Sequence, residues 1–200
     1  NEHGLKAKGI TGKLWGEAVK GSISHTGDLT RIQLGAKLAV KTLAKRYPSD
    51  LWKKINGDSQ TTLWVDVPDK SLAGGGKTTL TLKSNLQGVA IDLPQPIGKL
   101  KNKNSALEIT TNLEQEILRV GFLYADKLRG IALFKKNKLD KMLFDRANLH
   151  LGMSRSSLPK NKGLKLSGHL ATLNIDQWQQ ALIANNGGAV PSSDLNQLDL

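Results

Sequence analysis

The feature that most constrains this chain is an alternation of apolar and polar residues with a period of two. Between residues 30 and 41 every second side chain is apolar, at Ile32, Leu34, Ala36, Leu38 and Val40. The same alternation returns at Leu63, Val65 and Val67, at Leu80, Leu82 and Leu86, at Leu118, Val120, Phe122 and Tyr124, and at Leu164, Leu166 and Leu170. Successive side chains of a strand point to opposite faces, so the pattern predicts strands with one apolar and one wet face.

Turn-forming residues separate these segments. They stand at Thr26-Gly27-Asp28, Asn56-Gly57-Asp58, Gly74-Gly75-Gly76 and Lys162-Gly163. Such turns predict that neighbouring strands are joined by hairpins and pair antiparallel, as a meander. A meander builds a long curved sheet, a barrel or a sandwich, and the alternation alone leaves these three open.

Two segments break the strand pattern and are expected to be helical. Residues 41–55 space their apolar side chains as a helix does, and Pro48 divides them, with Ser49 available as an N-cap. We expect two short helices, or a helix-turn-helix, as an insert there. A terminal helix is expected over residues 176–184, with Asp176 as its N-cap and the Gly187-Gly188 pair after its end. The fold class is therefore mainly β with two or three short helices.

Composition favours a sheet that is apolar on one side. Only 38% of the 200 residues are hydrophobic and 4% are aromatic, a thin supply for a two-sided core. The chain has no cysteine, which excludes disulfides, thiolate metal sites and cysteine nucleophiles. No apolar run approaches the roughly 18 residues that cross a bilayer. Because Asn1 is not followed by a leader, we expect a piece excised from a longer protein.

The basic charge leaves two interpretations open. The formal net charge is +12, which invites a nucleic-acid or anionic-membrane partner. Twenty-three of the 29 basic residues are lysines, however, whereas nucleic-acid recognition relies on the arginine fork. Lysine on exposed strands also guards against edge-to-edge aggregation. Two dense clusters are candidates for turns that face anionic headgroups, namely Lys99, Lys101 and Lys103, and Lys135, Lys136 and Lys138.

Catalytic and cofactor motifs find no support. The run Gly74 to Thr78 imitates the end of a phosphate-binding loop, but Ser71 replaces the first glycine and a strand pattern follows. The four histidines are far apart and lack the spacing of metal ligands. No Gly-x-Ser-x-Gly elbow is present. We therefore predict no enzyme activity, no metal and no cofactor.

Two long runs resemble a known family. Residues 84–99 read SNLQGVAIDLPQPIGK and resemble the YhdP family pattern GLALDLPAPLGK. Residues 163–178 read GLKLSGHLATLNIDQW and resemble the same family's GLxLSGxLxxLDLDxW. The two runs occur in the family's order, so the resemblance covers most of the chain.

This resemblance implies an AsmA-like protein of the Gram-negative envelope. Such proteins are anchored in the inner membrane by a helix that this chain lacks, and extend into the periplasm. Their fold is expected to be a curved antiparallel sheet, an open groove or half-barrel, along which phospholipids pass toward the outer membrane. The chain, residues 1–200, would be one segment of that groove, with neighbouring segments of the same protein and phospholipid as its partners.

Site residues follow from combining the resemblance with the alternation. The residues expected to face acyl chains are Ile32, Leu34, Leu38, Leu63, Val65, Leu80 and Leu82, and the headgroups are expected near Lys99, Lys101 and Lys103. Two other functions stay open: a structural envelope module that binds no lipid, and a basic β domain that binds nucleic acid. We favour lipid transport and expect no nucleic-acid partner.

Overall fold

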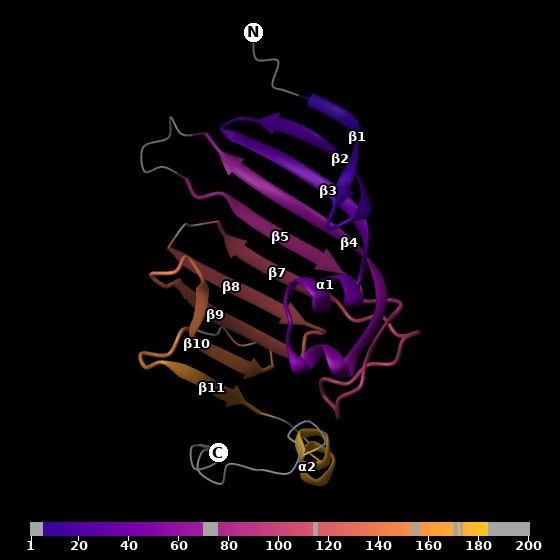
Figure 1. Cartoon of the computed structure of the whole chain (residues 1–200), viewed down its shortest axis with the longest axis vertical. Helices are drawn as coiled ribbons and strands as arrows, with labels where there is room; N and C mark the ends of the chain where they lie inside the picture. Colours follow the sequence, from indigo (N-terminus) through magenta and orange to yellow (C-terminus); the bar gives the residue numbers. More distant parts are fainter. Residues whose placement is uncertain are drawn as a thin grey trace.

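One open, curved sheet of eleven strands dominates the structure (Figure 1). The computed structural model describes residues 6–69, 76–113, 116–152, 154, 157–169, 172 and 174–183. The strands are β1 (Lys6–Leu14), β2 (Glu17–Thr26), β3 (Leu29–Ala39), β4 (Ile55–Pro68), β5 (Thr79–Ser84), β6 (Val89–Ile91), β7 (Leu107–Asn112), β8 (Ile117–Tyr124), β9 (Leu128–Lys136), β10 (Met142–Leu151) and β11 (Gly163–Gly168). This confirms the prediction of a mainly β fold built as a curved, open sheet.

The strand order follows the chain almost without exception. It runs β1-β2-β3-β4-β5-β7-β8-β9-β10-β11, and β6 pairs separately with the start of β4. Every neighbouring pair is antiparallel except the last, because β11 runs parallel to β10. The expected hairpin at Lys162-Gly163 is therefore wrong for this pair. The chain between β10 and β11 instead returns across the sheet, as a parallel connection requires.

The expected turn at Asn56-Gly57-Asp58 is also wrong. These residues lie inside β4, where Gly57 pairs with Val89 of β6 and Asp58 pairs with Ala39 of β3. Gly57 has a φ of +107°, and an added Cβ would stand 2.1 Å from the carbonyl oxygen of Gly88. Glycine is needed here because β4 changes its partner strand and its backbone comes close to that of Gly88. The chain does not reverse its direction at this point.

The helical insert predicted over 41–55 is confirmed as two short pieces. They are α1 (Val40–Arg46) and the 3₁₀ turn η1 (Asp50–Lys54). Pro48 lies between them, and the Ser49 hydroxyl accepts the N–H of Leu51 as an N-cap. The terminal helix α2 spans Ile175–Ile183.

The cap predicted for the terminal helix lies two residues too late in the chain. Asn174 and not Asp176 caps α2, because the Asn174 side-chain oxygen accepts the N–H of Gln177 at 3.0 Å. Asp176 lies in the first turn instead, where its negative charge interacts favourably with the helix dipole. Three other predicted features lie outside the described residues, namely the glycines 74 and 75, Leu170, and the Gly187-Gly188 pair after the terminal helix.

The buried core is small. The buried apolar side chains of the described residues are Val19, Ala36, Leu38, Val40, Val89, Tyr124, Leu133 and Ala147. None of these described side chains is less than 2% exposed, whereas a two-layered domain normally buries several large side chains completely. The sheet is thus a single layer over most of its area.

Candidate functional site

Strand register gathers the apolar side chains onto one side of the sheet, named here the apolar face. Residues directly opposite each other in a ladder share a face. One such row runs from β2 to β11 through Gly21, Leu34, Leu63, Leu82, Ile109, Phe122, Gly130, Leu149 and Leu166. The next row contains Ile23, Ile32, Val65, Leu80, Thr111, Val120, Ala132, Ala147 and Leu164. The apolar surface is therefore continuous across the sheet.

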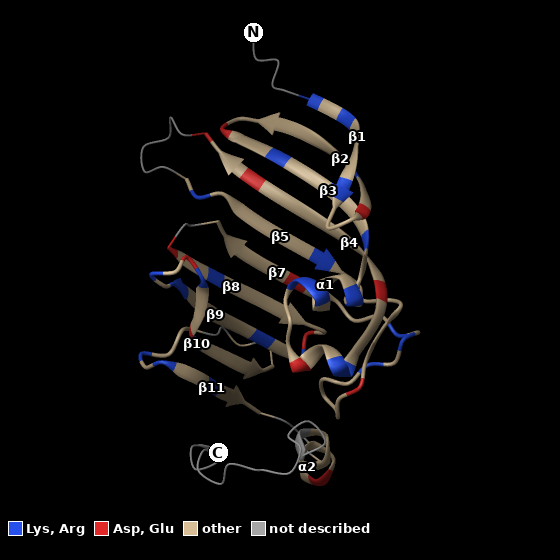
Figure 2. Ribbon diagram, viewed as in Figure 1, with Lys and Arg blue, Asp and Glu red and all other residues tan. Residues whose placement is uncertain are grey.

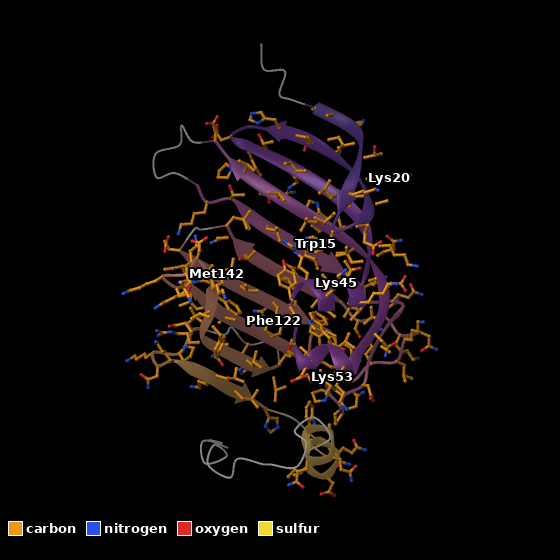
Figure 3. All side chains as sticks on the ribbon, viewed as in Figure 1. Trp15, Lys20, Lys45, Lys53, Phe122 and Met142 are labelled. Atoms are coloured by element: carbon orange, nitrogen blue, oxygen red, sulfur yellow. The ribbon has the colours of Figure 1, made fainter. Side chains whose placement is uncertain are left out.

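The glycine in β9 is covered by a neighbouring aromatic ring. A Cβ added at Gly130 would lie 2.1 Å from Cε1 of Phe122 and 2.9 Å from Cδ2 of Leu149. The Phe122 ring thus occupies the space that a side chain at position 130 would fill. Because residue 130 has no side chain, the Phe122 ring can lie against the backbone of β9 and does not project from the apolar face (Figure 3 labels Phe122).

One end of the apolar face is covered. Helix α1 lies over it near β2, since the Thr42 hydroxyl donates to Glu17, which shares this face. Further along, the Tyr124 hydroxyl donates to the carbonyl of Ile97 at 2.8 Å, so the segment 86–105 covers the ends of β5, β7 and β8. Away from that end most apolar side chains of the two rows are half-buried, whereas Ala147 is buried and Leu164 and Leu166 are exposed.

All seven residues expected to face acyl chains lie on the apolar face. Six are half exposed, and Leu38 alone is buried because it lies at the covered end. Their shared face is a fact of the register, whereas lipid contact stays a prediction. The equivalent side chains of β7 to β10 were not named as site residues, namely Ile109, Val120, Phe122, Phe134 and Leu149. Val120 and Phe122 already belong to a stated alternation, and extending the pattern through residues 107–111 and 128–134 adds Ile109 and Phe134.

The first of the three lysines expected near headgroups has a structural position instead. Lys99 is 8% exposed, and its ammonium donates to the carbonyls of Val89 at 2.7 Å and Leu100 at 3.0 Å. Burial lowers the pKa of Lys99 below its ordinary value. This side chain ties the 86–105 segment together and does not point into solvent. Lys101 and Lys103 are exposed, as a headgroup contact would require.

The opposite side of the sheet, named here the polar face, is held by charged pairs between adjacent strands. Arg31 of β3 donates to Asp66 of β4 at 2.6 and 2.8 Å, and Lys83 of β5 lies 3.0 Å from Glu108 of β7. The hydrogen bonds from Arg31 hold the pKa of the Asp66 carboxyl below its usual range. Figure 2 shows such blue and red positions beside each other on adjacent strands.

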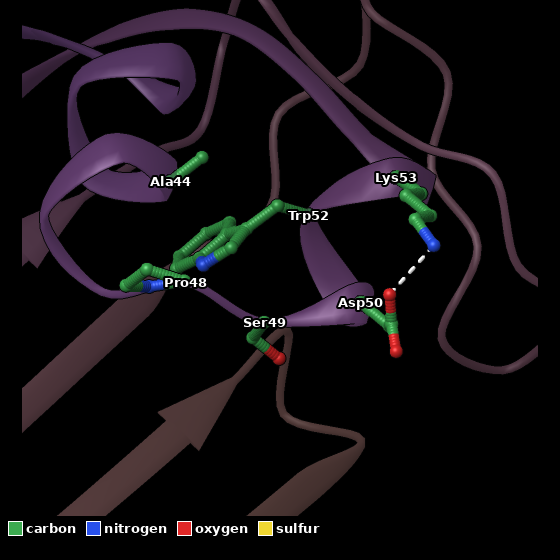
Figure 4. A pocket seen from close by; sticks show the side chains of 6 residues that line it. All are labelled: Ala44, Pro48, Ser49, Asp50, Trp52 and Lys53. Carbon is green, nitrogen blue, oxygen red and sulfur yellow. Dashed lines mark ion pairs between the residues drawn. The ribbon is translucent and has the colours of Figure 1, made fainter.

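Two shallow hollows lie outside the apolar face. The first, about 560 Å³, separates α1 from η1 and is lined by Ala44, Pro48, Ser49, Asp50, Trp52 and Lys53 (Figure 4). Its polar groups bind each other: the Trp52 indole donates to the Tyr47 carbonyl at 2.6 Å, and Lys53 lies 2.6 Å from Asp50. The second, about 460 Å³, lies on the polar face over Gly121. Neither contains an activated nucleophile or a paired acid and base.

No cluster of three or more His, Cys, Asp or Glu side chains suited to a metal occurs among the described residues. Nor does a helix of the described chain have the length and apolarity to cross a membrane. The apolar face, in contrast, extends from β2 to β11 in the described part of the chain.

These properties define a class of protein: an open, one-layered sheet whose continuous apolar face is covered at one end by α1 and residues 86–105 among the described residues. The particular family follows from comparison with known proteins. A model of the family described as YhdP protein matches residues 1–200, so the chain belongs to the YhdP family. It is thus an AsmA-like protein associated with the bacterial envelope. No curated protein and no solved structure matches the chain significantly.

Proposed function

We propose that this chain is an internal groove segment that shields phospholipid acyl chains on its apolar face as lipids pass between the inner and outer membranes. The observation that carries the proposal is the continuity of the apolar rows from β2 to β11. An apolar surface of this extent is costly to leave in water, and marks a binding surface in a soluble segment.

The geometry suits acyl chains better than a compact ligand. Acyl chains need a long apolar surface without specific polar partners, whereas a compact ligand needs an enclosed pocket with converging polar groups. The rows that contain Leu34 and Ile32 run across the strands, so the apolar surface follows the long direction of the sheet. Headgroups would remain in water at the strand ends, where Lys101 and Lys103 are exposed.

The proposal includes a place and partners for the segment. It lies in the periplasm, joined to an inner-membrane helix and to neighbouring groove segments of the same protein. It acts by binding and not by catalysis. A nucleic-acid function has less support, because Arg31, Lys83 and Lys37 of the polar face are already paired with Asp66, Glu108 and Asp58.

Photo-crosslinking in cells tests the proposal, because each apolar-face position has a neighbour that points the opposite way. A photoreactive residue at Leu34 or Leu82 is expected to capture phospholipid. The matched controls are Arg31 and Lys83, which lie in the same strands on the polar face. Equal labelling at all four positions would overturn the proposal.

Native mass spectrometry of the purified protein separates lipid transport from a structural module. A lipid-binding segment is expected to carry phospholipid that detergent displaces. A module that only holds partners would carry none, and that result together with failed crosslinking would favour the structural alternative.

A further inference from the structure

The hairpin between β9 and β10 ends in a cluster of exposed apolar side chains. This cluster, named here the β9–β10 tip, contains Leu139 in the turn and Met142, Leu143 and Phe144 at the start of β10. Leu139 is 75% exposed, Leu143 53% and Phe144 51%. Leu143 and Phe144 point to opposite faces of the sheet, so the tip is apolar on both sides.

The turn holds these side chains outward in a defined conformation. The Asn137 side-chain oxygen accepts the backbone N–H groups of Leu139 and Lys141, both at 2.9 Å. The Asn137 N–H in turn donates to the Lys141 carbonyl at 2.9 Å. The Phe144 ring meets Phe134 edge-to-face, with 5.9 Å between ring centroids. A turn tied in this way presents Leu139 to solvent at little conformational cost.

Lysines surround the apolar tip. Residues 135–141 contain four lysines and one aspartate, an excess of three positive charges. Lys136 pairs with Asp140 and Lys135 lies 3.5 Å from Asp145, whereas Lys138 and Lys141 make no ion pair within the described part of the chain. Figure 3 shows Met142 at the margin of the sheet opposite to Lys45 and Lys53, away from the covered end.

We propose that the β9–β10 tip docks on the surface of an anionic phospholipid bilayer. Leu139, Leu143 and Phe144 enter the interfacial region, and Lys138 and Lys141 contact lipid phosphates. Apolar side chains ringed by lysine bind such surfaces by combining buried apolar area with attraction to anionic headgroups. The charge of the tip selects this occupant over an apolar protein surface, which would leave Lys138 and Lys141 unpaired. The inference concerns an intact bilayer and does not rest on lipid binding by the apolar face.

Single cysteines test the docking directly, because the chain has none of its own. An environment-sensitive dye is attached at Leu139→Cys and, as the control, at Leu51→Cys. Leu51 is 52% exposed and stands close to Lys53 and Lys54, at a place where neither proposal puts lipid. Vesicles of phosphatidylethanolamine and phosphatidylglycerol should shift the emission of the dye at position 139 to the blue and leave position 51 unchanged.

Variants of the otherwise cysteine-free protein measure the two contributions in a vesicle sedimentation assay. Leu139→Asp is expected to weaken binding roughly tenfold. The variant removes an apolar side chain from the interface and introduces a carboxylate that the anionic headgroups repel. Lys138→Gln and Lys141→Gln should each weaken it about fivefold, and less at high salt. Leu51→Asp should have no effect. These exposed positions leave the fold intact, which circular dichroism verifies.

Three results would overturn the proposal. The first is a dye response at position 139 no larger than at position 51. The second is equal binding to vesicles of phosphatidylcholine alone, since the lysines would then have no role. The third is a blue shift without vesicles that grows with protein concentration, which would make a second copy of the chain the occupant of the tip.

Discussion

The two halves of the sheet use their second face differently. In the first half, β1 to β5, the face opposite the apolar rows is occupied by polar residues such as Arg31, Gln33 and Asp66, many of which bind each other across strands. In the second half, β7 to β11, the same face also contains apolar side chains, among them Leu123, Ile131 and Leu133. Leu133 is buried there, at 7% exposure.

The return of the chain between β10 and β11 explains the difference. Asn148 donates from the polar face to the Ser157 carbonyl at 2.9 Å, and Arg146 donates to the carbonyls of Pro159 and Lys160. Residues 157–160 therefore cross this face in the second half. Strict alternation is typical of a sheet whose polar face meets water, whereas apolar residues on the polar face of β8 and β9 are explained by the crossover that covers it.

The largest expected effect contrasts a covered apolar residue with an open one. Leu133→Ala should cost about 2–4 kcal/mol of the free energy of unfolding, because it leaves a cavity beside the crossover. Leu63→Ala removes the same atoms from the half-exposed apolar face and should cost roughly 1 kcal/mol, since part of that surface is already in water. Urea denaturation measures both, and equal losses would show that the two faces are equally covered.

An intermediate effect contrasts two arginines of the polar face. Arg146→Gln should cost about 1.5–3 kcal/mol, because it breaks the hydrogen bonds that hold the crossover as well as the contact with Asp145. The matched change Arg31→Gln breaks one exposed pair and should cost less than about 1 kcal/mol. Hydrogen exchange should show faster opening of residues 157–160 in the first variant only. Similar exchange in both would mean that Arg146 does not hold the crossover.

The smallest expected effect is the pH dependence of the exposed pair. Hydrogen bonds from Arg31 lower the pKa of Asp66 below its ordinary value of 3.8. A lowered folded-state pKa contributes stability that is present above 3.8 and is lost as the pH falls through the folded value. The stability difference between wild type and Arg31→Gln should therefore vanish in acid below that value. A difference that persists there would assign the effect of Arg31 to packing.

Much of the fold was predictable because its determinants are local. The alternation around Leu34, Leu63 and Leu82 depends only on the two-residue period of a strand, and the insert at 41–55 depends on helical spacing, Pro48 and Ser49. The single apolar face followed from the same period. Each of these features needs no knowledge of what lies elsewhere in the chain.

Three features depended on distant contacts and were not predicted. Residues 56–58 have the composition of a turn, but pairing with β6 keeps Gly57 inside strand β4. Lys99 belongs to a charged cluster in the sequence, but its ammonium is buried and donates to the carbonyls of Val89 and Leu100. The stretch before Gly163 has the sequence of a hairpin, yet β11 pairs parallel to β10.

The amino-acid sequence by itself determined that this chain forms one-faced strands with one continuous apolar surface, because the period of a strand assigns every side chain to a side. Which parts of the sheet are covered depends instead on the tertiary structure. On the apolar face the cover comes from α1 and from residues 86–105, through contacts between residues far apart in the chain, such as Thr42 with Glu17 and Tyr124 with Ile97. On the polar face it comes from the crossover at 157–160, through Arg146 and Asn148.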